Sequence, residues 1–259
     1  AGEVCFAVLA STHAAVRWDP SPTTEPAPKQ PSPAEPSKPA EPAKPEPAKP
    51  AEPAKPEPAK APGRTAQDAE RSKQLLEKLV AIHSDLTLIK AAVEQYSPIA
   101  EKEKLDGVAS LMRAIARAET INLELVSAAI AKAGGTPKVE ADATKIAKRF
   151  PVASGANATS ANLDIVISTL KSLRDIDFPA LSTLAVADKN RDVQTLARYG
   201  RESATEHGRF ARDAHDTPEK WKSKRDFFVS RKCGYTVDKL DLDKCPVCRA
   251  ARDNFERVN

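Results

Sequence analysis

The sequence has few aromatic residues, a single methionine and no long apolar run. Aromatic residues make up 5% of the 259 residues, whereas alanine and the aliphatic residues are plentiful, which is typical of helices that pack through aliphatic faces. We therefore expect an all-α fold. No apolar run reaches the roughly 18 residues of a transmembrane helix, so none is predicted. The 40 basic and 36 acidic residues are interspersed, without a basic block or an aromatic-basic motif, and nucleic acid is not an expected partner.

Proline is concentrated in one segment near the start of the chain. Of the 22 prolines, 16 lie between Pro20 and Pro62, in a stretch without a large apolar residue. Such a stretch cannot bury enough apolar surface to offset its ordering entropy, so we predict a disordered linker at residues 19–64. Its repeats, such as AEPAKPEPAKP at Ala40–Pro50, favour an extended polyproline II spacer that tethers the folded part to a membrane or cell wall. A ligand for an SH3-type domain is the alternative.

The first residues are apolar and are followed by small ones. Val4–Ala10 is an apolar run, and Ser11 and two alanines come shortly after it. This pattern is typical of the end of a secretory signal, so we interpret residues 1–18 as the remnant of one and expect a periplasmic or envelope-associated protein. A buried strand in a cytoplasmic protein is the alternative. A lipid anchor on Cys5 is less favoured, because Val4 precedes it where lipoprotein signals have a small residue.

Hydrophobic spacing predicts helices after the linker. On the first, apolar residues recur every three or four positions, at Leu75, Leu76, Leu79, Ile82, Leu86, Ile89, Val93 and Tyr96. Ser84 and Asp85 are expected to interrupt or restart this helix, which should end near Pro98. A second helix is expected from about Leu105 to Lys132, and glycines should stop it at Gly134.

Two further helices are expected after a long connection. Thr159 or Ser160 should cap the third helix, and Pro179 should kink it. The fourth is expected at about Arg191–His215. Two helical hairpins joined by a connection of more than about twenty residues predict a ferritin-like four-helix bundle with one long crossover, at residues 65–216.

Three of the four cysteines lie near the C-terminus. Cys245 and Cys248 form a CPVC knuckle, in which two intervening residues let both thiolates face one ion while backbone amides point at the sulfurs. Cys233 is followed by Gly-Tyr, as in the second half of a partner knuckle, whose first position holds Ser230. Three thiolates, with Ser230 or water as the fourth ligand, can complete a tetrahedron around iron or zinc. A metal-free knuckle with oxidised or buried cysteines is the alternative.

Residues 217–259 resemble the rubredoxin-like module of rubrerythrins. That module has the pattern CxxCGY, a short spacer, CPxC and a later Phe, and the matching residues here are Cys233, Gly234, Tyr235, Cys245, Pro246, Cys248 and Phe255. The predicted bundle also has the rubrerythrin layout, and Phe178–Ala185 (FPALSTLA) resembles the family's YPxFxxxA segment. The resemblance covers roughly residues 84–258. It implies a ferritin-like four-helix bundle followed by a small rubredoxin-like, zinc-ribbon-like knuckle.

The resemblance also implies an oxidoreductase, because rubrerythrins reduce peroxide at a di-iron site that takes electrons from the rubredoxin-type iron. That site needs carboxylates from all four helices and ExxH pairs on the second and fourth. The second helix offers Glu119, but Asn122 stands in place of its histidine. The fourth offers His207, but Ala204 stands in place of its carboxylate.

The first and third helices also lack the expected inward carboxylates. The third has Leu170 and Leu173 at about those places, and Glu94 is the nearest acid on the first. We therefore expect no complete di-iron site. We interpret Glu119 and His207 as a satisfied buried polar cluster, with ligation of a single metal as the alternative. Acidic residues such as Glu101 and Glu103 are expected on solvated faces.

Two functions follow from these observations. The first is an exported, rubrerythrin-like electron-transfer protein with iron bound by Cys233, Cys245, Cys248 and Ser230, in which inherited peroxide reduction is in doubt. Its partner would be a redox protein or a second copy in a homodimer. The second is a non-catalytic structural or interaction module with a zinc-bound or metal-free knuckle, held at a distance by the proline-rich spacer. The sequence leaves open whether any catalysis survives.

Overall fold

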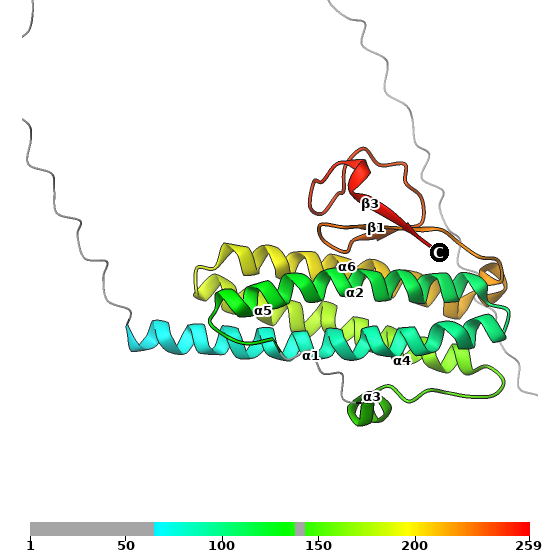
Figure 1. Cartoon of the computed structure of the whole chain (residues 1–259), viewed down its shortest axis with the longest axis horizontal. Coiled ribbons are helices and arrows are strands. Elements are labelled where there is room, and N and C mark those ends of the chain that lie inside the picture. The colour runs from blue at the N-terminus through cyan, green and yellow to red at the C-terminus, as the bar shows by residue number, and fades with distance from the viewer. Residues whose placement is uncertain (1–64, 138–142) are drawn as a thin grey trace, which may run out of the picture. The chain divides into compact units, whose positions relative to one another are not determined.

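The computed structural model describes residues 65–137 and 143–259. The predicted signal remnant and proline-rich linker lie outside these residues. The described part is mainly helical, and its helices are α1 (Ala66–Lys102), α2 (Asp106–Lys132), α3 (Ala143–Arg149), α4 (Ala158–Ser172), α5 (Phe178–Ala187) and α6 (Arg191–Asp216). Four long rods lie side by side, namely α1, α2, the α4–α5 pair and α6, and α3 lies beside them in the crossover (Figure 1). This is the predicted ferritin-like bundle with one long crossover.

The first helix begins at a capping box and runs unbroken. The amide of Asp68 donates to the Thr65 hydroxyl, and the Asp68 carboxylate accepts from the Thr65 amide, both at 3.1 Å, so two otherwise unsatisfied amides are paired. The expected interruption at Ser84 and Asp85 is wrong, because α1 continues through both residues to Lys102. Asp85 forms an ion pair with Arg149 of α3. Its polarity therefore marks a contact with the crossover and not a break in the helix.

The crossover returns the chain to the bundle at the start of α4. Asn157, in the left-handed conformation, is the N-cap residue and contributes no side-chain cap, contrary to the expectation for Thr159 or Ser160. The Glu103 carboxylate, from the turn after α1, instead accepts hydrogen bonds from the amides of Ala158 and Thr159, at 2.8 and 3.2 Å. Glu103 is therefore a helix cap supplied from a distant part of the sequence, and the expectation of a merely solvated carboxylate was wrong for it.

The third rod is interrupted ahead of its proline. Between α4 and α5 the π-helical segment η1 (Leu173–Asp177) widens the helix, and the amide of Phe178 donates to the carbonyl of Leu173. Pro179 then occupies the first turn of α5, where a missing amide costs little. The expected disturbance near Pro179 is present, but it takes the form of a π-helical turn just before the proline.

The C-terminal module is a three-stranded antiparallel sheet with two loops. It follows α6 through a short 3₁₀ helix, η2 (Pro218–Trp221), and its elements are β1 (Phe227–Ser230), β2 (Thr236–Val237), a 3₁₀ turn η3 (Arg252–Asn254) and β3 (Phe255–Val258). The strand order is β2-β1-β3. The module lies along α2 and α6 (Figure 1).

Aromatic packing joins the module to the bundle. The Phe227 ring of β1 meets Phe210 of α6 edge-on at 5.3 Å and stacks on Trp221 at 6.2 Å. All three side chains belong to the same buried cluster as the bundle core. An ion pair between Arg117 of α2 and Glu256 of β3 adds a polar link. The module and the helices therefore share one core, which fixes the module's position on α2 and α6.

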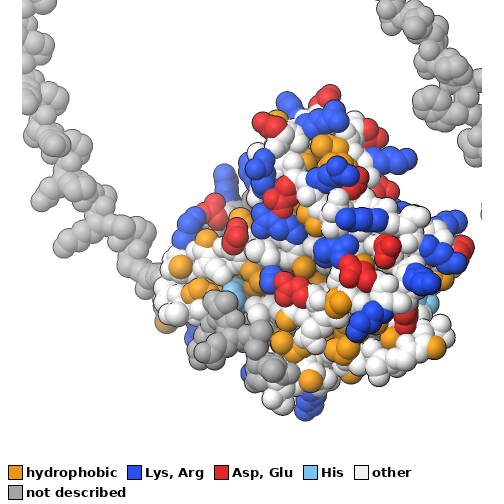
Figure 2. Space-filling view, turned by 45° about the vertical axis from the view of Figure 1, so that its right-hand side comes forward, with side chains coloured by type: hydrophobic (Ala, Val, Ile, Leu, Met, Phe, Trp, Pro, Cys, Tyr) orange, Lys and Arg blue, Asp and Glu red, His pale blue; other side chains and the backbone are white. Residues whose placement is uncertain are grey.

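The surface of the described part is mixed in charge. Figure 2 shows lysine and arginine side chains interspersed with aspartate and glutamate over the face that it presents. Within residues 65–137 and 143–259, no helix is both long and apolar enough to cross a membrane.

Candidate metal centre

Two tight turns bring the cysteines of the module together. In the first, the amides of Cys233 and Gly234 donate to the carbonyl of Ser230, at 3.3 and 2.8 Å. In the second, the amide of Arg249 donates to the carbonyl of Cys245 at 3.0 Å. The residue after the last cysteine of each turn has a positive φ, +72° at Gly234 and +60° at Arg249. The two halves thus share one backbone design, although only one of them has two cysteines.

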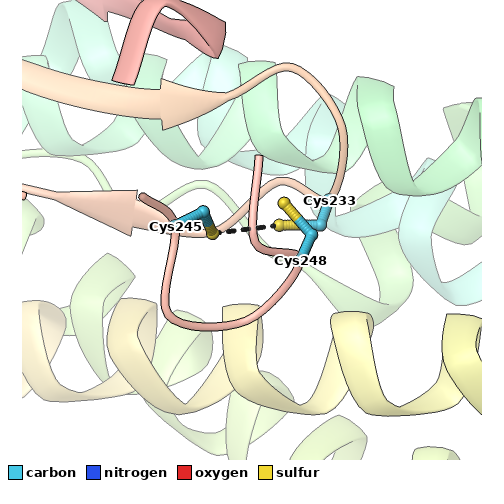
Figure 3. Close-up of side chains that lie close together, drawn as sticks. All are labelled: Cys233, Cys245 and Cys248. Atoms are coloured by element: carbon cyan, nitrogen blue, oxygen red, sulfur yellow. Dashed lines mark hydrogen bonds between the residues drawn. The ribbon is translucent and has the colours of Figure 1, made fainter. Parts of the chain in front are cut away.

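The three thiols converge on one point. Their sulfurs lie within 4.8 Å of one another, and Cys233 Sγ is 3.7 Å from Cys245 Sγ. Figure 3 shows the side chains of Cys233, Cys245 and Cys248 pointing toward one another from the two loops. The Ser230 hydroxyl closes the group, since its Oγ lies 3.5 Å from the sulfurs of both Cys233 and Cys248. The structure thus brings together all four residues that the sequence selected for this site.

These separations fit a tetrahedral metal ion. Zinc bonds of about 2.3 Å to sulfur and about 2.0 Å to oxygen give tetrahedral edges of about 3.8 Å between two sulfurs and about 3.5 Å between sulfur and oxygen. The observed distances of 3.7 and 3.5 Å match these edges. Cys233, Cys245 and Ser230 are fully buried, and Cys248 is 7% exposed. The group can therefore hold iron or zinc in a closed site without large movement of its side chains.

Hydrogen bonds around the sulfurs favour thiolate. A hydrogen bond from Cys233, followed by backbone N–H groups of Cys248 and Val247, lowers the pKa of Cys245 to about 5 despite its burial. The same sulfur-sulfur contact raises the pKa of Cys233, and burial raises it further. The contact between the two sulfurs therefore favours thiolate on Cys245 and thiol on Cys233. A cation in the site would favour the thiolate form of both.

Glu119 and His207 belong to a buried polar cluster, as expected, but this cluster lies at a different place from the one the sequence suggested. We expected them to face the interior of the bundle, but the structure places them between α2, α6 and the module. The Glu119 carboxylate accepts a hydrogen bond of 3.0 Å from the Asn122 amide, and its other oxygen is 3.7 Å from His207 Nδ1. His207 Nε2 is 2.8 Å from the hydroxyl of Thr236 in β2. Both residues therefore belong to a buried polar contact between the bundle and the module.

Ser203 and the carbonyl of Gly234 complete this contact. Ser203 of α6 donates a hydrogen bond of 2.8 Å to the carbonyl of Gly234, and Thr236 donates one of 3.1 Å to the same carbonyl. We call Glu119, Asn122, Ser203, His207 and Thr236 the docking cluster; all five are buried. Sequence reasoning missed Thr236, because nothing in a two-residue strand marks it as the partner of a histidine in another element.

The other positions considered for bundle ligands have ordinary structural environments. Leu170 and Leu173 are buried in the aliphatic core. Glu94 lies on the surface and forms an ion pair of 2.7 Å with Lys90. Glu101 pairs with Arg113 at 2.6 Å. Within the described residues, the cysteine group is the one cluster of three or more Cys, His, Asp or Glu ligand atoms close enough to share an ion.

The fold and the cysteine site together define a ferritin-like helical bundle with a rubredoxin-like module. Solved structures of nigerythrin, a rubrerythrin-type protein, share this fold. The partially reduced and mixed-valence structures each have a TM-score of 0.61 and 21% identity, over 71% of this chain and 86% of nigerythrin. The fully reduced, all-ferrous structure has the same TM-score and coverage at 22% identity. At this identity the likeness establishes the shared fold.

Sequence comparisons give no further assignment. No family model matches the sequence. The curated proteins contain no match to it either.

Proposed function

We propose that the protein is an electron carrier whose C-terminal module binds one iron ion through Cys233, Cys245, Cys248 and Ser230. The observation that carries this proposal is the buried group of three sulfurs and one hydroxyl, with separations that match a tetrahedral metal site. The shared fold supports iron, because nigerythrin is described in reduced, mixed-valence and all-ferrous states. Bound iron would supply one-electron exchange between its ferrous and ferric forms.

The protein's own residues suit this role. The loops surround the site on nearly all sides, so solvent and competing ligands are kept away from the sulfurs. Backbone N–H groups of Val247 and Cys248 point at Cys245, and that of Tyr235 points at Cys233. Such hydrogen bonds stabilise thiolate charge and help to set the reduction potential of an iron-sulfur site.

One edge of the site is suited to exchange with a partner. Cys233 and Cys245 have no exposed surface, whereas Cys248 and Val247 are each 7% exposed. The guanidinium of Arg198 donates a hydrogen bond of 2.7 Å to the Val247 carbonyl and is itself exposed. We propose that a redox partner, or a second copy of this chain, approaches over this edge, where the path from a cysteine to the surface is shortest.

We propose no di-iron chemistry for the bundle. Leu170 and Leu173 occupy the places considered for third-helix carboxylates and pack in an aliphatic core. Glu119 and His207 are held in the docking cluster, where their contacts go to Asn122 and Thr236. A di-iron site would need several oxygen ligands close together, and burying unpaired carboxylates among leucines is costly. Peroxide reduction at such a site is therefore left out of the proposal.

A structural zinc site is the second candidate. It is favoured by the number of donors, because four protein ligands without an open position are the usual arrangement of structural zinc. The same module is anchored to the bundle through Phe227 and Trp221, which is also expected of a stapled structural unit.

Redox cycling of the purified full chain separates the two candidates. The protein would be expressed with iron in the medium, and its visible spectrum recorded after oxidation and after reduction with dithionite. We expect thiolate-to-iron absorption that is bleached by reduction and regained on oxidation. Cys245→Ala should abolish it, and Cys5→Ala, which removes the cysteine outside the module, should not. Selective retention of zinc in iron-supplemented cells, or loss of all metal, would overturn the electron-transfer proposal.

A further inference from the structure

The Gly234 carbonyl connects the docking cluster with the cysteine site. It accepts two hydrogen bonds, one of 2.8 Å from Ser203 and one of 3.1 Å from Thr236. Both hydroxyls are fully buried, so the bonds act in a region of low dielectric constant. A carbonyl with two such donors is more strongly polarised than one that faces water.

The other end of the same peptide unit touches a proposed metal ligand. The amide of Tyr235 shares its peptide plane with the Gly234 carbonyl, and its N–H donates to the sulfur of Cys233. Hydrogen bonds at the two ends of one amide strengthen each other, because polarising the carbonyl makes the N–H a better donor. Donors on the bundle can thereby act on the Cys233 sulfur without touching it.

His207 orients one of the two donors. The Thr236 hydroxyl carries a single proton; with that proton on the Gly234 carbonyl, the donor of the 2.8 Å contact is His207 Nε2–H. This assignment follows from the hydrogen-bond network. The carboxylate of Glu119 lies 3.7 Å from the other ring nitrogen, Nδ1. The series of contacts thus runs from α2 through α6 to β2.

Glycine at position 234 lets the peptide come this close to the helices. Its φ is +72°, a backbone conformation that residues with a side chain rarely adopt. A Cβ there would lie 3.1 Å from the Ala118 carbonyl and 3.4 Å from the Ser203 hydroxyl. The backbone therefore rests close against α2 and α6, and a side chain here would be strained and tightly packed.

We propose that the Gly234–Tyr235 peptide relays the influence of the bundle to the metal centre. Ser203 and the His207–Thr236 pair are positioning residues, because they polarise this peptide and strengthen its N–H···S bond to the metal-binding thiolate. The inference rests on the proposed function, since it assigns these residues a role toward the metal bound by the cysteines. Residues on the bundle that look like remnants of metal ligation would then serve the neighbouring site from outside it.

The relay should act on the reduction potential. An N–H···S bond withdraws negative charge from the sulfur and favours the ferrous state over the more highly charged ferric state. Removing one of the hydroxyl groups that donate to the Gly234 carbonyl should therefore lower the preference for ferrous over ferric iron. Loss of an outer hydrogen-bond partner at a metal site typically changes affinity about 10-fold to 100-fold. A tenfold change in this preference corresponds to about 59 mV for one electron.

The test compares four variants of the full chain loaded with iron. Ser203→Ala and Thr236→Val each remove one donor with little change in volume. Thr205→Ala is the matched control, because its hydroxyl bonds to Arg201 of its own helix on the exposed side of α6. Two quantities are measured: the reduction potential of the iron form, and the amide-proton chemical shift of Tyr235 in the zinc form. Ser203→Thr, which keeps the hydroxyl, tests for rescue.

We expect Ser203→Ala and Thr236→Val to lower the potential by up to about 59 mV and to move the Tyr235 amide signal upfield. Thr205→Ala and Ser203→Thr should stay near the wild type. The relay is overturned if either donor variant binds metal and has the same reduction potential and the same Tyr235 amide shift as the wild type. Two donor variants are used so that poor folding of one leaves the other to decide. A wild-type protein that binds no metal overturns the proposed function itself, whereas unchanged donor variants overturn the relay alone.

Discussion

The Ser230 hydroxyl lies 3.5 Å from the sulfur of Cys248, at the position that completes a tetrahedron with three thiols. A thiolate there would bind iron or zinc more strongly than a hydroxyl does, because soft ligands favour these metals. We expect Ser230→Cys to raise metal affinity and Ser230→Ala to lower it, each by about tenfold, which is about 1.4 kcal/mol. Competition with a chromogenic chelator measures both. Equal affinities for Ser230→Ala and the wild type would show that the hydroxyl is not a ligand.

Phe178 packs directly against Gly200 of α6. A Cβ on Gly200 would lie 2.1 Å from the ring of Phe178, which is itself buried. Gly200→Ala should therefore destabilise the protein by about 1–3 kcal/mol through overpacking. Gly208 of the same helix is the control, because its Cβ would meet nothing closer than 3.6 Å, and Gly208→Ala should stabilise by up to about 1 kcal/mol. Urea unfolding of the metal-free proteins measures both, and similar effects of the two substitutions would contradict this packing.

Local sequence patterns were sufficient to predict the first helix and the cysteine knuckle. The spacing of Leu79, Ile82 and Leu86 is enough to predict α1, because an apolar stripe must be buried whatever the partner, and all three are buried. The spacing of Cys245 and Cys248 predicted the knuckle, because its geometry is set within a few residues. Local signals therefore predicted the helices and the cysteine group.

Contacts between distant segments were not predictable in the same way. Glu103 caps α4 from the end of another helical hairpin, and Asp85 pairs with the crossover, so their acidity alone suggested only solvation or a break. The direction of Glu119 and His207 was also missed. A polar residue on a buried face gives no sign of whether a helix or an added module covers it. Here the module does, and it supplies Thr236 as the partner of His207.

Arg249 takes a left-handed conformation at the end of the second knuckle turn. Its φ is +60°, whereas the equivalent position of the first turn is Gly234. A non-glycine residue pays roughly 1 kcal/mol for this conformation. Arg249→Gly should therefore leave the stability within about 1 kcal/mol of the wild type and keep metal binding, because relief of strain offsets the freedom that glycine adds to the unfolded chain. Arg249→Val should instead cost more than about 1 kcal/mol, since β-branched residues rarely adopt a positive φ. Thermal unfolding distinguishes the two, and equal melting temperatures would contradict the role assigned to this turn.

Tyr96 gives the bundle a predictable response to alkaline pH. Its hydroxyl donates a hydrogen bond of 3.1 Å to the Pro151 carbonyl, and burial raises its pKa to about 12. Since the pKa in the unfolded chain is about 10, the stabilisation from this group is fully present below pH about 10 and is lost as the pH rises through about 12.

Tyr96→Phe tests this assignment. It removes the hydrogen bond while keeping the ring, and we expect it to cost about 1 kcal/mol at pH 7. The difference between wild type and variant should then shrink between pH about 10 and 12, as the tyrosine ionises. Urea unfolding at several pH values measures the difference. If the difference in unfolding free energy between wild type and variant stays constant over this range, Tyr96 does not titrate as its buried position requires.

The decisive measurement is the iron content of the protein before and after one cysteine is removed. The full chain and its Cys245→Ala variant would be reconstituted with ferrous iron under the same conditions, freed of loosely bound metal and analysed for iron. The account predicts about one iron per chain in the wild type and almost none in the variant, because the cysteine group is the proposed metal site. Two or three irons per chain, retained when Cys245 is replaced, would place the metal in the helical bundle and contradict it.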